Sequence, residues 1–85
     1  MSEINQISGR QIAAARALLG LGQVELADNA NISAPTLRRM EASVGAVAGT
    51  TNNVAAVRRA LESAGIIFID DERGEGVVKL RDRQG

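Results

Sequence analysis

Two short segments separated by a tight turn constrain the fold of this chain more than any other feature of its sequence. The first segment runs from Gln23 to Ala30, and the second begins after Ser33. Ala27 supplies a small side chain where two such helices would have to cross closely. Asn31 falls in the turn, and Asn tolerates a positive φ better than most residues do. The pattern therefore predicts two helices packed across a tight turn, the arrangement called a helix-turn-helix.

The second helix of this pair has distinct inner and outer faces. Ser33 is a good N-cap for it, and Pro35 falls in its first turn, where a missing N–H costs nothing. Arg38 and Arg39 share the outer face with Pro35. Two adjacent arginines are usually just a solvated face, so their meaning depends on the helices around them. The apolar residues expected to hold the crossing are Leu26, Ala30, Ile32, Leu37 and Met40.

A further helix is expected on the N-terminal side of this pair. Ser8 and Gln11 have the spacing of a capping box. The segment Arg10–Leu19 is rich in strong helix formers, and Gly20 ends it. Arg16 lies in the middle of an otherwise apolar stripe of this helix, so it needs a partner.

The C-terminal half predicts one more helix and then a β-hairpin. Thr50 or Thr51 can cap a helix that reaches Ala64, with apolar residues at helical spacing. Ile66–Ile69 is a run of large apolar residues that predicts a strand, and Val77–Leu80 predicts a second one. The fold class is therefore mainly α, with four to five short helices followed by a C-terminal β-hairpin.

Both faces of the first predicted strand are apolar. Alternation puts Ile66 and Phe68 on one face, and Ile67 and Ile69 on the other. The segment Asp70–Gly76 is expected to form the turn. One layer of helices can cover only one face, so a second copy of the chain is expected on the other, unless the hairpin is buried entirely against its own helices. The residues expected at the dimer contact are Ile66, Ile67, Phe68, Ile69, Val78 and Leu80.

The length of 85 residues implies a single domain. Its expected sections are an N-terminal lead over residues 1–7, a helix-turn-helix domain over 8–64, a β-hairpin for dimerisation over 65–80 and a polar tail over 81–85. A lone domain of this size buries a modest fraction of its surface, and oligomerisation is one common supplement.

The composition excludes several classes of function. The chain has no Cys, His, Trp or Tyr, and Phe68 is its only aromatic residue. It therefore lacks thiolate nucleophiles, histidine triads, ordinary zinc ligands and an aromatic stacking platform. We expect no enzyme activity, no metal and no cofactor. No apolar run approaches a membrane span and no secretory signal begins the chain, so a cytoplasmic protein without a membrane partner is expected.

The formal net charge is zero, from ten basic and ten acidic residues. Four of the acidic residues fall in the predicted hairpin turn, which lacks the pattern of a calcium-binding loop. These residues are Asp70, Asp71, Glu72 and Glu75. Because negative charge is gathered there, a cationic surface elsewhere is compatible with zero net charge.

The segment from Gln11 to Glu41 resembles the Cro/repressor-type (XRE-like) helix-turn-helix family. The residues that carry the resemblance are the run ARALLGLGQVELA followed by NISAPTLRRME. The sequence departs from the family pattern at Gly22, where Ser or Thr usually caps the second helix, and at Asn31, which replaces the turn glycine. Both residues are acceptable at those positions, so neither departure breaks the fold.

The resemblance implies DNA contacts at individual residues of the helix pair. Gln23 looks like the glutamine that contacts the DNA backbone, and Ser33 and Thr36 look like phosphate or groove-edge contacts. The face that reads bases is occupied by Ala34, Pro35, Arg38 and Arg39. The two arginines are the candidates for direct readout of guanine N7 and O6.

The family also supplies a partner for the arginine on the apolar stripe. It has a buried ion pair between the first helix and the end of the recognition helix, which corresponds here to Arg16 and Glu41. The helical faces point to the same pair, because Glu41 follows Leu37 by four residues on the inner side.

The resemblance implies a small transcriptional regulator that binds a double-stranded DNA operator as a homodimer. Two recognition helices would lie about 34 Å apart on a pseudo-palindromic site. A repressor that occludes a promoter, of bacterial or phage type, is the simplest form, and an activator is equally compatible. The alternative is a protein-interaction module, such as an antitoxin or anti-activator, that sequesters a protein partner through its hairpin.

Overall fold

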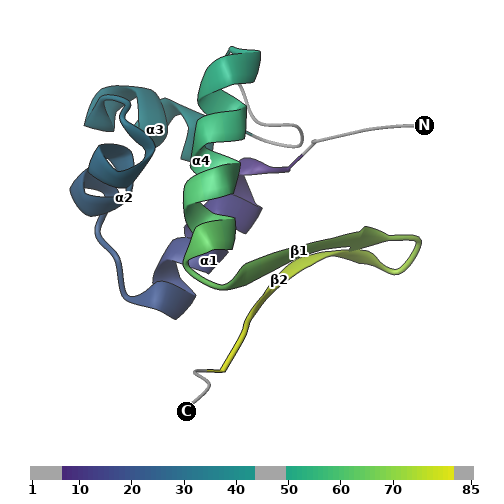
Figure 1. Cartoon of the computed structure of the whole chain (residues 1–85). Coiled ribbons are helices and arrows are strands. Elements are labelled where there is room, and N and C mark those ends of the chain that lie inside the picture. The colour runs from purple at the N-terminus through teal and green to yellow at the C-terminus, as the bar shows by residue number, and fades with distance from the viewer. Residues whose placement is uncertain (1–6, 44–49, 82–85) are drawn as a thin grey trace.

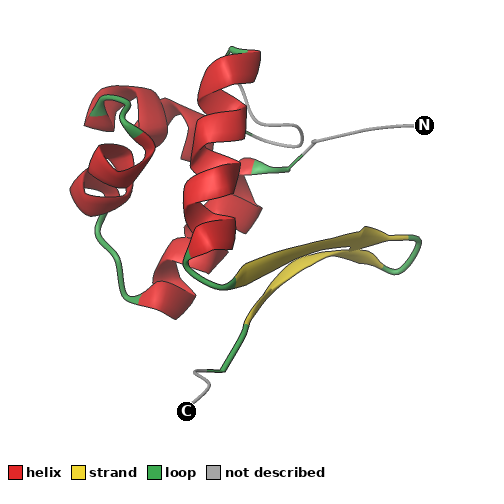
Figure 2. Ribbon diagram, viewed as in Figure 1, coloured by secondary structure: helices red, strands yellow, loops and turns green. Residues whose placement is uncertain are grey.

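Helices form the body of the molecule, and a β-hairpin extends from one side of it (Figures 1 and 2). The computed structural model describes residues 7–43 and 50–81. The lead before residue 7, the middle of the connection between the third and fourth helices, and the tail after residue 81 lie outside these ranges. The elements are α1 (Gly9–Leu19), α2 (Gln23–Ala30), α3 (Ala34–Glu41), α4 (Thr51–Ser63), β1 (Ile66–Asp71) and β2 (Gly74–Lys79).

The caps expected from the sequence define the helix boundaries. Ser8 and Gln11 form a reciprocal capping box at α1, with hydrogen bonds of 3.0 and 2.9 Å. The hydroxyls of Ser33 and Thr50 each accept a hydrogen bond from the backbone N–H three residues on, at the starts of α3 and α4. Asn31 ends α2 at φ +61°, the left-handed conformation that the turn requires. The predictions of the first four helices are confirmed within a residue or two at each end.

The core lies where α1, α2, α3 and α4 meet, and it extends to the base of β1. Its buried apolar residues are Ile7, Ile12, Ala15, Leu26, Ala27, Ala30, Leu37, Met40, Val57, Leu61 and Ile66. Ile7 is the last residue of the expected N-terminal lead, and the structure places it in the core. Ile7 directly precedes the N-cap Ser8, and Ile12 is the fourth residue of α1. Two apolar residues at this spacing pack against each other at the start of a helix and form a hydrophobic staple.

The start of α1 is packed against the end of α3 with no space to spare. A Cβ at Gly9 would lie 2.5 Å from the carbonyl oxygen of Met40, 2.6 Å from that of Glu41 and 2.8 Å from that of Ser43. These distances are far below van der Waals contact. Only a glycine fits at this position. Because it has no side chain, α1 and α3 can approach each other this closely.

The hairpin turn is tighter than the sequence predicted. The strands were expected to stop at Ile69 and to restart at Val77, but pairing continues to Asp71 opposite Gly74. The Asp71 carboxylate accepts a hydrogen bond from the backbone N–H of Arg73 at 2.9 Å, and Gly74 adopts φ +143°. These local features close the chain in two residues, so charged residues assigned to a loop belong to strands.

The two faces of the hairpin have different surroundings. Ile66 is buried in the chain's own core, and Phe68 is half-buried against it, with the Arg58 guanidinium 5.0 Å from the ring centroid. These two residues were expected at a dimer contact, and the structure instead places them against α4 and the core. Ile67 and Ile69 point the other way and are exposed. The hairpin is therefore neither buried on both faces nor fully covered by its own helices.

The side chain of Gln11 fastens the hairpin to α1. Its Oε1 accepts from the Ser8 backbone, and its Nε2 donates to the carbonyl oxygens of Ile69 at 2.9 Å and Gly76 at 3.0 Å. Both amide hydrogens and one acceptor site are thus used by a residue that is buried. One residue therefore caps a helix and holds a sheet that is more than fifty positions away in the chain.

Replacing Gln11 by Met should loosen the attachment of the hairpin. Met has a similar length but offers no amide group, so the bond from the Ser8 backbone N–H and both contacts to the strands are lost, while the bond from the backbone N–H of residue 11 to Ser8 Oγ remains. We expect a loss of about 1–2 kcal/mol in the free energy of unfolding, measured by urea denaturation. Arg10 precedes Gln11 on α1 and is exposed. The control substitution Arg10→Met should therefore change the free energy of unfolding little. An unchanged denaturation midpoint for Gln11→Met would show that the clamp contributes nothing.

Candidate nucleic-acid interface

Helices α2 and α3 are joined by a short turn and present one exposed surface formed mainly by α3. Leu37 and Met40 of α3 are buried in the core, whereas Arg38 and Arg39 are exposed. Pro35 is exposed on the same outer side, one turn earlier. The sequence-predicted division of α3 into inner and outer faces is thus confirmed.

The other side chains at the start of α3 are less available to a ligand than the sequence suggested. Ala34 is half-buried and packs against the core, so little of its methyl group is available to a ligand. Ser33 uses its hydroxyl oxygen to cap the helix and donates its proton to Thr36 Oγ1 at 2.8 Å. The Thr36 hydroxyl therefore keeps its own proton for an outside acceptor. Of this pair, Thr36 is the better placed to donate a hydrogen bond to a ligand.

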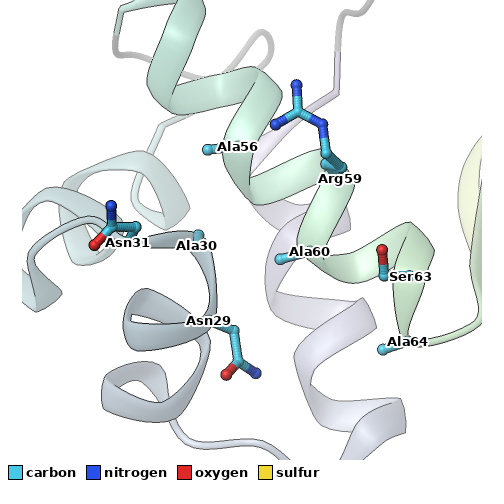
Figure 3. A pocket seen from close by; sticks show the side chains of 8 residues that line it. All are labelled: Asn29, Ala30, Asn31, Ala56, Arg59, Ala60, Ser63 and Ala64. Carbon is cyan, nitrogen blue, oxygen red and sulfur yellow. The ribbon is translucent and has the colours of Figure 1, made fainter.

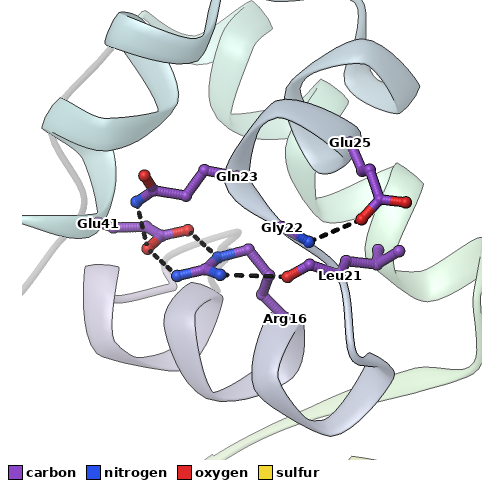
Figure 4. A network of polar contacts seen from close by, with 6 residues as sticks. All are labelled: Arg16, Leu21, Gly22, Gln23, Glu25 and Glu41. Atoms are coloured by element: carbon purple, nitrogen blue, oxygen red, sulfur yellow. Dashed lines mark hydrogen bonds and ion pairs between the residues drawn. The ribbon is translucent and has the colours of Figure 1, made fainter.

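A polar network connects α1, α2 and α3 behind the exposed face (Figure 4). Arg16 donates from Nε to Glu41 Oε2 at 2.8 Å and from Nη2 to Oε1 at 3.0 Å. Its Nη1 donates to the carbonyl oxygen of Leu21 at 3.1 Å, in the connection between α1 and α2. The expected ion pair is confirmed, and its two parallel hydrogen bonds fix the relative orientation of guanidinium and carboxylate.

The network is shielded from water on the Glu41 side. The side chain of Glu41 is 8% exposed and that of Arg16 is 24% exposed. The hydrogen bonds to Glu41 raise the pKa of Arg16 above its ordinary value, so the guanidinium stays charged. The end of α3 is thereby held to α1 by a charge pair that water reaches mainly from one side.

Gln23 belongs to this network as well as to the candidate surface. Its Nε2 donates to Glu41 Oε1 at 3.0 Å, which leaves the second amide hydrogen for another acceptor. The sequence indicated a ligand contact for Gln23 but gave no sign of the bond to Glu41. Beside it, Glu25 accepts from the backbone N–H of Gly22 at 2.9 Å, which caps α2 although Gly22 has no side chain of its own (Figure 4).

The charges of the molecule are separated in space. Within residues 7–43 and 50–81, Arg38 and Arg39 form no ion pair. Arg58 pairs with Glu62 on α4, and the acidic residues of the hairpin lie at its far end. The outer face of α3 is therefore positive, with no carboxylate of its own helix beside it, because Glu41 points inward to Arg16.

An open depression of about 600 Å³ lies between α2 and α4, on a different part of the surface (Figure 3). Its floor is formed by alanines of both helices, and the charged side chain at its rim is Arg59. Asn29, Asn31 and Ser63 are the other polar residues around it. These lining residues include no acid–base pair.

Two other features bear on the class of site. No group of three or more Asp, Glu, His or Cys side chains in the described ranges is placed to hold a metal ion. None of the helices there combines the length and the apolar character that crossing a membrane requires.

Comparisons with protein families and with curated proteins find no match to this chain. The exposed face of α3 is therefore the candidate site on its own geometry.

Proposed function

We propose that this protein is a small transcriptional regulator that binds a specific sequence of double-stranded DNA and acts as a homodimer. The observation that carries the proposal is the pair Arg38 and Arg39, which are exposed and have no ion-pair partner within residues 7–43 and 50–81, on a helix that the Arg16–Glu41 ion pair anchors to α1. In this role α2 and α3 form a helix-turn-helix. Helix α3 enters the major groove, and α2 crosses the backbone beside it.

The dimensions of α3 suit this role. An α-helix with its side chains is about 10–12 Å across, which fits a major groove about 12 Å wide, and the eight residues of α3 give it a length of about 12 Å. The inner side of α3 is anchored by Leu37 and Met40, so its outer side can face the bases without rearrangement of the core. A rigid reading helix avoids the entropy of ordering a flexible segment on binding.

The side chains of the surface have complementary tasks in this proposal. Arg38 or Arg39 donates two hydrogen bonds to guanine N7 and O6, and Pro35 offers an apolar contact to a thymine methyl. The free hydrogens of Thr36 and Gln23 bind phosphate oxygens, which fixes the register of the helix on the duplex. Gln23 therefore connects phosphate binding to the Glu41 network that orients α3.

Single substitutions of the two arginines test the proposal. Selection from a random DNA library defines the site, and fluorescence anisotropy at several salt concentrations measures its affinity. We expect Arg38→Ala or Arg39→Ala to weaken binding about tenfold or more. The arginine that reads a base should also relax preference at one base pair. One that binds phosphate should reduce the salt slope by about one and leave preference intact.

Arg59→Ala is the matched control, because Arg59 is also exposed and carries no ion pair in the described residues but lies on α4. It removes the same charge, so any effect of net charge alone appears equally in all three variants. If Arg38→Ala and Arg39→Ala bind the selected site as tightly as Arg59→Ala does, the outer face of α3 does not read DNA. If no sequence is enriched in the selection, the proposed function is wrong.

A further inference from the structure

The outer face of α3 presents hydrogen-bond donors and apolar groups, but no carboxylate and no amide side chain. Arg38 and Arg39 are exposed there, and a guanidinium can only donate. Pro35 is exposed one turn earlier and offers only carbon atoms. Glu41 is the one residue of α3 with a carboxylate, and none has a side-chain amide. The side chain of Glu41 is 8% exposed and is bound to Arg16, so it does not belong to the outer face.

The hydroxyl groups at the start of α3 are arranged to donate outward. Ser33 Oγ accepts from the Thr36 backbone N–H at 3.2 Å and donates its own proton to Thr36 Oγ1 at 2.8 Å. The proton of Thr36 is then the one that can point to a ligand. The first turn of an α-helix also carries a positive partial charge. Both features extend the donor character of the two arginines to the beginning of the helix.

The backbone acceptors at the other end of α3 are occupied or covered. The last four carbonyl groups of a helix have no partner inside it, so they are a common source of exposed acceptors. In α3, three of them accept hydrogen bonds from Ala42 and Ser43. The fourth, the carbonyl of Glu41, lies against Gly9 of α1. The end of the helix therefore adds no free acceptor to the outer face.

The amide side chains that lie nearest to α3 in the sequence are used elsewhere. Asn29 and Asn31 line the depression between α2 and α4 (Figure 3). Gln23 donates from Nε2 to Glu41 at 3.0 Å, which holds its amide in the network behind the face. An amide that reads a base would have to leave one of these positions.

The four bases differ in the groups that they show in the major groove. Guanine presents two acceptors, N7 and O6, and thymine presents the acceptor O4 and a methyl group. Adenine and cytosine each present an amino group, which is bound by the oxygen of an amide or a carboxylate. A face of donors and carbon atoms is complementary to guanine and thymine, and it has no such oxygen for an amino group.

We propose that the base contacts of α3 are made to guanine and thymine only, and that no amino group of adenine or cytosine is bound. This inference rests on the proposed DNA-binding function and names the chemical groups that the surface takes from its site. An arginine binds N7 and O6 of guanine, and Pro35 packs on the methyl group of thymine. The inward turn of Glu41, which stabilises the fold, is also what removes the acceptor from this face.

Deletion of single groups from the selected DNA site tests the inference. Uracil in place of thymine deletes the methyl group, and a guanine analogue with C–H in place of N7 deletes one acceptor. At a contacted position, each should weaken binding about fourfold or more in fluorescence anisotropy, since one buried methyl group is worth about that factor. Unsubstituted purine in place of adenine deletes only the amino group, and it should weaken binding no more inside the contacted positions than outside them.

Inosine in place of guanine is the matched control, because it keeps N7 and O6 and loses only an amino group of the minor groove. It should leave the affinity unchanged. The methyl contact is assigned by repeating the comparison of thymine with uracil in Pro35→Gly. The ratio of the two affinities should fall to about one in this variant, and any change in its folding affects both DNAs equally. A ratio equal to that of the wild type would contradict the role of Pro35.

Arg38→Gln and Arg39→Gln test the missing acceptor from the protein side. Glutamine carries a donor and an acceptor, so it can bind N7 and the amino group of adenine together. When the selection is repeated, the variant of the base-reading arginine should change the preference at one base pair from guanine to adenine. Arg59→Gln removes the same charge from α4 and should select the wild-type sequence. Enrichment of adenine by Arg59→Gln as well would contradict the assignment to α3.

Failure of this inference can be distinguished from failure of the proposed function. Suppose that a sequence is selected, that Arg38→Ala or Arg39→Ala weakens binding to it, and that deletion of an adenine amino group there weakens binding as much as loss of a guanine N7. The DNA-binding function would then stand, and the restriction to guanine and thymine would be wrong. If no sequence is enriched, both are wrong.

Discussion

Glu41→Ala is expected to lower the free energy of unfolding by about 3 kcal/mol, a large share of the 5–15 kcal/mol typical of a domain. The substitution removes both hydrogen bonds that the carboxylate accepts from Arg16 and the one that it accepts from Gln23. The guanidinium is then left inside the helical body with the Leu21 carbonyl as its remaining partner. We place the loss at the lower end for a broken buried pair, since Arg16 keeps a quarter of its side chain in contact with water. Urea denaturation followed by far-UV circular dichroism measures the change.

A double substitution separates the cost of the stranded charge from the value of the pair. Arg16→Met with Glu41→Leu replaces both partners with apolar side chains of similar size, so no charge remains unpaired. We expect this variant to be more stable than Glu41→Ala alone, because desolvation of two charges offsets much of what the pair contributes. If the double variant is as unstable as the single one, packing around position 41 and not charge is responsible.

The exposed pair Arg58–Glu62 is the matched control. Its nitrogen and oxygen are 2.9 Å apart against 2.8 Å for Arg16–Glu41, but the side chain of Glu62 is 46% exposed. Glu62→Ala should therefore cost about 0.3–0.5 kcal/mol, as is usual for an exposed pair on a helix. Equal losses for Glu41→Ala and Glu62→Ala would contradict the assignment of Glu41 as a buried anchor.

Local signals in the sequence were enough to locate the helices and their ends. Helices α1, α3 and α4 each begin at a cap whose side chain accepts a hydrogen bond from a backbone N–H three residues on, and α2 ends at Asn31, which tolerates a positive φ. Such short-range chemistry is readable because both partners lie in the same few residues. The pair Arg16 and Glu41 was also predictable, because an arginine on an apolar stripe demands a partner and the family resemblance of the sequence implied Glu41.

The features that the sequence did not reveal depend on contacts between distant elements. The Gln11 amide was recognised as half of a capping box, but its bonds to Ile69 and Gly76 need the hairpin to lie across α1. Alternation along β1 identified two apolar faces without showing which of them the helices cover. The sequence did not predict the tight turn because charged residues such as Asp71 and Glu75 are typical of loops. The positive φ of Gly74 allows the pairing of β1 with β2 to continue to Asp71.

Gly9 is the position where the smallest change should have one of the largest effects. Adding a single methyl group in Gly9→Ala would put Cβ within 2.8 Å of three carbonyl oxygens at the end of α3. These are backbone atoms that cannot rotate away, so α1 and α3 must separate. We expect a loss of about 3 kcal/mol in the free energy of unfolding, toward the upper end for overpacking, despite the better helix propensity of Ala. Chemical denaturation of the purified variant gives the value directly.

The effect should reach the candidate DNA surface as well as stability, because the end of α3 that would be displaced carries Glu41 and, one turn before it, Arg38. Gly22→Ala is the matched control, since its Cβ would meet Glu25 Oε1 at 3.6 Å, an ordinary contact, and its φ of −80° suits alanine. Gly22→Ala should cost less than about 1 kcal/mol, the usual effect at an N-cap. If Gly9→Ala is no less stable than Gly22→Ala, then α1 and α3 do not approach as closely as the structure shows. In that case the close contact between α1 and α3 at Gly9 would not be what orients Arg38.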